Sequence, residues 1–154
     1  MIHIEGFRIA SLDQLNKIRD NCTATISDYA LTSGAASAIP VPGLDVAADV
    51  GVMLKMFSAL RSRYSLDTVN SADFKHYGIL ATVASDVFAY VTKEGILKFL
   101  TKYGSKAIAK KTVTKYIPFV GIGIAAYTGY KLTVAMGEQY STNCYTLCRE
   151  ILNA

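Results

Sequence analysis

The sequence has little of what metal centres, disulfide frameworks and nucleotide sites require. Its 154 residues include no tryptophan, two histidines and three cysteines. Three scattered cysteines are too few for a disulfide framework, which points to a reducing, cytosolic setting. Neither His3 nor His76 has metal-like neighbours, and no Gly-x-x-x-x-Gly-Lys-Ser/Thr phosphate loop is present. We therefore expect no metal, no cofactor and no catalytic residue, and a protein that is not an enzyme.

Charge is also scarce, and it is unevenly placed. Charged residues make up 18% of the chain and apolar residues 51%, against a usual charged share of about a quarter. Residues 96–137 contain seven lysines and no acidic residue, so this stretch carries +7 and the remainder −3. The basic character is therefore local, in a chain that is more apolar than an average soluble domain.

No apolar run has the length and purity of a membrane span. The stretch from Ile117 to Tyr130 contains 14 residues before Lys131 interrupts it, whereas a spanning helix needs about 20. We predict a buried central helix here, with a membrane span as the less favoured alternative.

The spacing of apolar residues predicts an all-α, single-domain helical bundle of about six helices. Ser11 and Gln14 form a capping box that starts the first helix. The predicted helices cover residues 12–38, 44–64, 71–84, 86–103, 106–116 and 120–151. We expect the first two to pack as an antiparallel hairpin, the last to run through or along the core, and Gly104 to end the fourth. Residues 1–10 would be a tail or the seam of a longer chain, and residues 11–154 the helical domain.

A proline-rich corner separates the first two predicted helices. Pro40 and Pro42 fix their own φ and hold the preceding residues extended, and Gly43 can adopt a positive φ. Asp45 would lie in the first turn of the next helix, where its carboxylate meets the positive end of the helix dipole. Because the corner is mostly apolar, we expect it to pack against the rest of the fold or against a membrane.

The residues around this corner resemble a known family. Residues 30–44 read Ala-Leu-Thr-Ser-Gly-Ala-Ala-Ser-Ala-Ile-Pro-Val-Pro-Gly-Leu and resemble the start of the C-terminal helical domain of the interferon-inducible immunity-related GTPases. Residues 11–29 and 125–152 are similar to two further helices of that domain, and a bacterial family of inner-membrane-associated helical proteins has a similar turn. The resemblance implies a helical domain that oligomerises and docks on intracellular or vacuolar membranes, here without the GTPase part.

Six lysines form a basic ladder at spacings close to four, interleaved with apolar residues. They are Lys98, Lys102, Lys106, Lys110, Lys111 and Lys115. A helix with one cationic and one apolar face suits an anionic membrane surface, at about 1 kcal/mol per basic residue. The alternatives are an acidic protein partner, or a solvated face whose apolar side packs into the core. No nucleic-acid motif accompanies the ladder, so we expect no nucleic acid partner.

Two further pairs are spaced by four residues. Cys144 and Cys148 are a candidate lipidation site, although buried thiols are the commoner arrangement. Asp45 and Asp49 would share a helix face as an acid/base or metal pair, but no histidine or third acid lies nearby in the sequence.

The sequence thus predicts a non-enzymatic helical domain, cytoplasmic and peripherally membrane-associated. It would bind an anionic membrane surface or a protein partner, or form homo-oligomers. The alternatives are a small bacterial-type membrane-associated helical protein and a ligand-binding helical bundle.

Overall fold

The computed structural model describes residues 2–32, 39–40, 47–109 and 124–154. Most of this part of the chain is helical, which confirms the predicted all-α class, and it holds five α-helices and one 3-10 helix. In chain order the elements are α1 (Leu12–Leu31), β1 (Ile39–Pro40), β2 (Ala47–Ala48), α2 (Val50–Arg63), the 3-10 helix η2 (Ser71–Phe74), α3 (Ile79–Phe88), α4 (Lys93–Ala109) and α5 (Ile124–Asn153).

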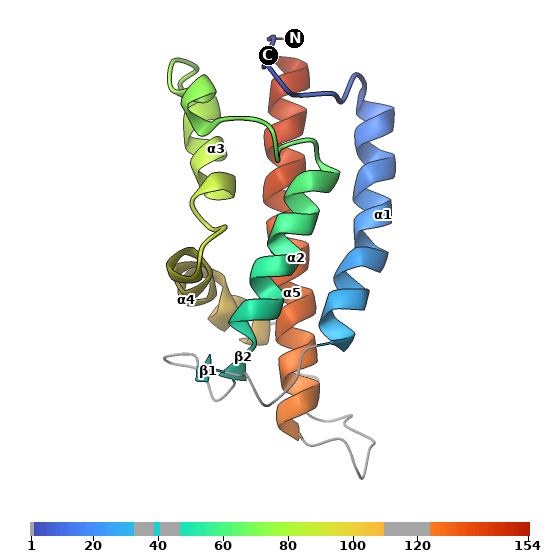
Figure 1. The fold of residues 1–154 in the computed structure, drawn as a ribbon, viewed down its shortest axis with the longest axis vertical. Coiled ribbons are helices and arrows are strands. Elements are labelled where there is room, and N and C mark those ends of the chain that lie inside the picture. The colour runs from blue at the N-terminus through green and yellow to red at the C-terminus, as the bar shows by residue number, and fades with distance from the viewer. Residues whose placement is uncertain (1, 33–38, 41–46, 110–123) are drawn as a thin grey trace.

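The helix α5 is the centre of the bundle, as Figure 1 shows, and it contacts all four of the other α-helices. Its inward positions recur at three and four residues, as expected for a helix that is covered along its length. Leu132, Met136, Tyr140, Leu147 and Ile151 are all buried. The prediction that the last helix runs along the core is therefore confirmed.

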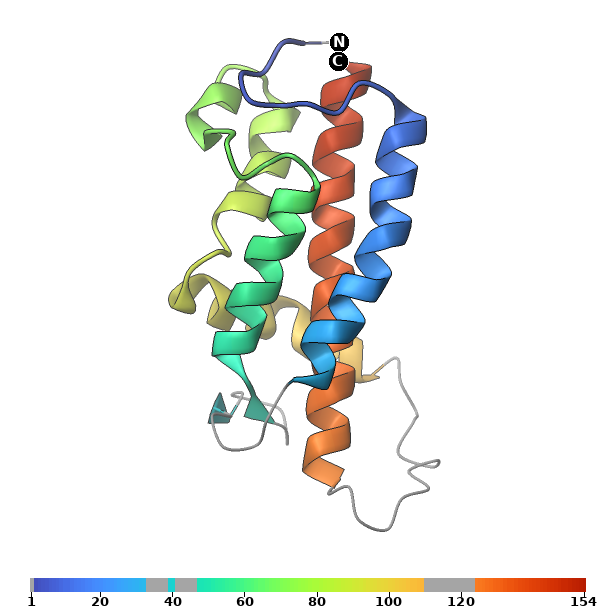
Figure 2. The same ribbon diagram turned by 45° about the vertical axis from the view of Figure 1, so that its right-hand side comes forward.

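The helices α1 and α2 pack antiparallel beside α5, as predicted (Figures 1 and 2). The three helices approach one another closely at Gly137 of α5. A Cβ atom added there would lie 2.9 Å from Ile26 Cγ2 of α1 and 2.9 Å from Met56 Sδ of α2. The absence of a side chain at Gly137 thus lets three helices meet at one level of the bundle.

The start of α1 follows the predicted capping pattern. The Ser11 hydroxyl accepts a hydrogen bond from Gln14 N at 3.2 Å, and Gln14 Oε1 accepts one from Ala10 N at 2.9 Å. These contacts satisfy amides that have no partner inside the helix. The helix ends at Leu31, well before the predicted end at residue 38, and Thr32 caps it through its hydroxyl, which donates to Tyr29 O at 2.8 Å.

The second helix begins later than the sequence predicted. Asp49 is the N-cap of α2, since its Oδ1 accepts from Val52 N at 3.1 Å. The prediction of a helix from residue 44, with Asp45 in its first turn, is wrong because Ala47 and Ala48 form a two-residue antiparallel ladder with Pro40 and Ile39. Pro42, Gly43 and Asp45, the rest of the predicted corner, lie outside the described residues.

The helix boundaries in the middle of the chain also differ from those predicted. The expected helix over 71–84 is split into η2 and the start of α3. Asp86, where the next helix was expected to begin, lies inside α3. The helix α3 ends at Phe88, and α4 starts after Thr92. The Thr92 hydroxyl accepts a hydrogen bond from Gly95 N at 2.9 Å. Gly104 does not end a helix, because α4 continues to Ala109. Residues 110–116 of the predicted basic helix lie outside the described residues.

Candidate functional site

The basic face predicted from the lysine ladder is present on α4 at its first two positions. Lys98 and Lys102 are exposed one turn apart, and Ile96, Phe99 and Leu100 are buried on the other side of the helix. Lys106 belongs to the same helix, since α4 is continuous through Gly104. Lys110, Lys111 and Lys115 lie outside the described residues.

Lys102 has acidic and aromatic neighbours. Its Nζ lies 3.5 Å from Asp86 Oδ1 of α3 and 5.2 Å from the centre of the Tyr103 ring. A hydrogen bond with the Tyr103 side chain, and next the Asp86 carboxylate, raise the pKa of Lys102. Both partners of the ion pair are substantially exposed, with 51% and 39% of their side-chain surfaces accessible. Such a pair is weak in water, so Lys102 can exchange this partner for another anion.

The apolar side of α4 is fixed in the core by a cluster of aromatic rings. The Phe99 ring lies 4.9 Å from Phe57 of α2, 4.9 Å from Tyr90 and 4.7 Å from Tyr103, measured between ring centres. Pairs of this kind add about 0.5–1.5 kcal/mol beyond their buried area. The helix therefore presents its charged side outward while its apolar side is occupied, and it can meet a surface without inserting into it.

The two cysteines considered for lipidation are buried, which is the alternative that the sequence favoured. Cys144 and Cys148 are both 0% exposed. Cys148 Sγ donates to Tyr64 O at 3.4 Å. Burial raises the pKa of both thiols, so neither is a reactive thiolate near neutral pH. A modifying enzyme cannot reach them in this conformation.

Buried hydroxyl groups near these cysteines have hydrogen-bond partners within the protein. Tyr64 Oη and Ser141 Oγ are 2.7 Å apart, and the Tyr140 hydroxyl donates to Val87 O at 2.9 Å. Among the described residues, no buried side-chain nitrogen or oxygen lacks a hydrogen-bond partner. These groups therefore have a structural role, since each is held by a fixed partner.

The predicted alternative of a carboxylate pair has no support in the part of the chain that is described. Asp49 is 8% exposed and holds the first turn of α2, while Asp45 lies outside the described residues. Within the described ranges, no group of three or more His, Cys, Asp or Glu residues is placed to hold a metal ion. His76 is exposed in the connection between η2 and α3.

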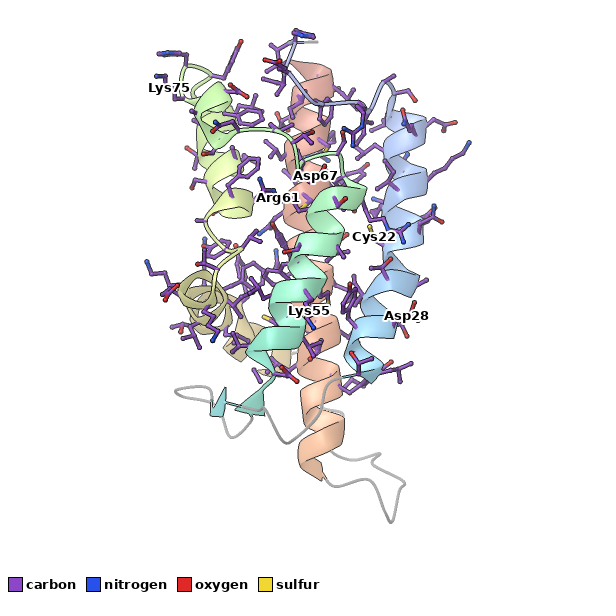
Figure 3. The ribbon with its side chains drawn as sticks, in the orientation of Figure 1. Cys22, Asp28, Lys55, Arg61, Asp67 and Lys75 are labelled. Atoms are coloured by element: carbon purple, nitrogen blue, oxygen red, sulfur yellow. The ribbon has the colours of Figure 1, made fainter. Side chains whose placement is uncertain are left out.

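A polar pocket that the sequence did not reveal lies beside Arg61 at the end of α2, between α2 and α3 (Figure 3). Arg61 and Arg63 are the basic residues in the last turn of α2, where cations complement the helix dipole. Nothing local in the sequence shows that Phe88, 27 positions later, lies beneath the Arg61 guanidinium at 4.7 Å. The pocket was therefore not predictable from spacing.

Comparison with known proteins finds no relative: no family model, no curated protein and no solved structure matches the chain. Among the described helices, none combines the length and the apolar character that crossing a bilayer requires.

Proposed function

We propose that this chain is a non-enzymatic helical domain that docks on an anionic membrane surface through the basic segment from Lys98 to Lys115. The observation that carries the proposal is the orientation of α4. Lys98 and Lys102 face outward from a helix whose apolar side is packed in the core. Binding would be peripheral and electrostatic, because lipid attracts the lysine side chains without drawing the helix into the bilayer.

Two sequence features support the same proposal. The segment 96–137 concentrates seven lysines with no acid, which is the composition of a surface that attracts anionic lipid. The resemblance of residues 30–44 to the helical domain of the immunity-related GTPases favours membrane docking and self-association over catalysis.

The test is co-sedimentation of the purified chain with vesicles of phosphatidylcholine alone, and of phosphatidylcholine with phosphatidylserine. We expect binding that requires the anionic lipid and fades between low and high salt, because salt screens exposed charges. Reversing two lysines with Lys98→Glu and Lys102→Glu should weaken binding at least tenfold, from about 1 kcal/mol per basic residue.

The matched control is the double variant Lys17→Glu and Lys55→Glu. It changes the net charge equally, at two exposed lysines on α1 and α2, and should bind within about twofold of the parent chain. Binding that is insensitive to anionic lipid, or equal losses in both double variants, would contradict the proposal.

The second candidate function is docking on an acidic protein partner or on a second copy of the chain. The observation that favours it is the exposed pair between Lys102 and Asp86 at 3.5 Å, since each partner can exchange the other for a charge on another protein surface. Absence of vesicle binding, together with a dimer mass in light scattering that K98E/K102E abolishes, would select self-association.

A further inference from the structure

A polar pocket of about 360 Å³ opens where α2 ends and the chain crosses to η2 (Figure 3). It is built from residues other than the lysines of α4. Its lining consists of Arg61, Asp67, Thr68, Val69, Asn70, Ser71 and Phe88. Polar groups dominate this lining, and a single cation, Arg61, is partly buried within it.

The Arg61 side chain is held in one orientation from two directions. Its Nε donates to Leu66 O at 2.9 Å, and its guanidinium carbon lies 4.7 Å above the centre of the Phe88 ring. The backbone carbonyl oxygen of Arg61 also accepts a hydrogen bond from Leu66 N at 3.0 Å. A guanidinium fixed through Nε and one ring face loses little freedom when its terminal nitrogens bind a ligand.

The charge of Arg61 has no acidic partner in the described part of the chain. The ion pairs of Arg8, Lys102 and Arg149 involve other carboxylates and do not include Arg61. The Arg61 charge also reaches the core: burial raises the pKa of Tyr140 and Cys144, and Arg61 partly offsets both increases. A partly buried guanidinium that forms no ion pair of its own can form charge-assisted hydrogen bonds with an anion that enters beside it.

The remaining polar groups of the pocket match a singly charged anion. The Asn70 Oδ1 accepts from Ala72 N at 3.0 Å, so the amide nitrogen of Asn70 keeps its donors for a ligand. Asp67 Oδ1 lies 3.8 Å from Arg8 NH2. Arg8, Asp67 and Arg61 together carry one net positive charge, which one carboxylate neutralises and a doubly charged phosphate exceeds.

We propose that this pocket binds a carboxylate group, received by the terminal nitrogens of Arg61 and the side-chain amide of Asn70. The carboxylate is supplied by an acidic side chain of a protein partner or by a free small carboxylic acid. The planar fork of a guanidinium donates two parallel hydrogen bonds to the two oxygens of such a group.

The test is NMR titration of the ¹⁵N-labelled full chain with sodium acetate, at constant ionic strength set by sodium chloride. We expect saturable shifts of the Arg61 Nε–H, Asn70 side-chain and Ser71 backbone signals. The variant Arg61→Gln should raise the acetate Kd at least tenfold. The matched control is Arg63→Gln, an exposed arginine in the last turn of the same helix, which should change the Kd less than twofold.

A second variant separates binding from folding, because Arg61→Gln also removes the bond to Leu66 O. Ser71→Glu adds a negative charge at an exposed lining position without touching that bond, and it should also raise the acetate Kd at least tenfold. Shifts that do not saturate, that appear equally with chloride, or that survive both variants would overturn the proposal.

Further titrations test whether the bound anion is a carboxylate and whether it comes from a protein side chain or a free acid. Inorganic phosphate should bind more weakly than acetate, and tighter phosphate binding would overturn the assignment to a carboxylate. N-acetyl-glutamate amide that binds more tightly than acetate, while N-acetyl-glutamine amide does not bind, would identify a protein side chain as the source. Equal affinities for acetate and N-acetyl-glutamate amide would identify a free small acid.

Discussion

Tyr64 and Ser141 join α2 to the central helix through a hydrogen bond of 2.7 Å between their hydroxyl oxygens. Tyr64 is fully buried and Ser141 is 6% exposed. The residues are 77 positions apart in the sequence, so the bond forms only when the end of α2 is in its correct position against α5.

Removing this hydrogen bond is the first prediction. We expect Tyr64→Phe to lower the free energy of unfolding by about 1–2 kcal/mol, because the Ser141 hydroxyl is left buried without its partner. Urea denaturation followed by circular dichroism measures the change. Ser141→Ala should give a loss of its own, and the double variant should lose less than the sum of the two single variants. Strict additivity would show that the two hydroxyls do not interact.

The second prediction compares two helical glycines. A Cβ atom at Gly95 would lie 2.7 Å from Tyr90 Cα and also collide with the Ala89 carbonyl oxygen. Since both obstacles are backbone atoms, we expect Gly95→Ala to destabilise the protein by about 1–3 kcal/mol.

Gly51 of α2 is the control, because a Cβ atom there meets only Asp49 Oδ1 at an ordinary 3.5 Å. Gly51→Ala should stabilise the protein by about 0.5–1 kcal/mol through helix propensity. Thermal unfolding of the two variants should shift in opposite directions, and equal shifts would contradict the packing of α4 against the 89–92 connection.

The third prediction concerns the start of α2. Asp49→Ala removes the cap of Val52 N and should cost about 0.5–2 kcal/mol, while Asp49→Asn should retain most of the stability because it keeps the accepting oxygen. Chemical denaturation distinguishes the two. If Asp49→Asn were as damaging as Asp49→Ala, the charge of Asp49, and not its capping oxygen, would be responsible.

The fourth prediction is a loss of stability at alkaline pH. Burial raises the pKa of the Cys22, Cys144 and Cys148 thiols above the value of about 8.5 that is usual for a free thiol. Above about pH 9 the unfolded chain therefore holds fewer protons than the folded one. The thiols should leave the free energy of unfolding unchanged between pH 7 and that pH. Above it, each thiol should lower the free energy of unfolding by about 1.4 kcal/mol per pH unit, until its folded-state pKa is reached.

Denaturation series from pH 7 to pH 10 measure this slope. Cys148→Ala lowers the overall stability by leaving a cavity, but it should also make the alkaline slope shallower by about one thiol's contribution. An unchanged slope would mean that folding does not raise the pKa of Cys148. At neutral pH, an aromatic disulfide reagent should modify the native thiols only as fast as the protein unfolds.

What the sequence predicts correctly here depends on neighbours close along the chain. Ser11 and Gln14 indicate the start of α1 because the capping contacts span only a few residues. Burial of Cys144 and Cys148 follows from their common face on a long amphipathic helix.

The errors arise where a distant segment decides the local structure. The spacing of Ala47 and Ala48 fits a helix, but their pairing with residues 39–40 holds them extended. The sequence predicts a helix over 86–103, whereas α4 starts after Thr92. The helix packs against both α2 and α5, with Phe99 beside Phe57, and these contacts are not visible in the local sequence. The Arg61 pocket is not visible in the sequence for the same reason, since Phe88 approaches Arg61 only in the folded bundle.

The position of α5 in the chain also bears on how the protein is made. The four other α-helices of the described residues all contact α5, and all four precede it in the sequence. Until α5 is synthesised, the earlier helices can contact only one another, and the apolar surface that α5 covers in the folded bundle is exposed and prone to aggregation. We expect the nascent chain to rely on chaperones up to this point, and to reach its native packing only after the final turns of α5 have been synthesised.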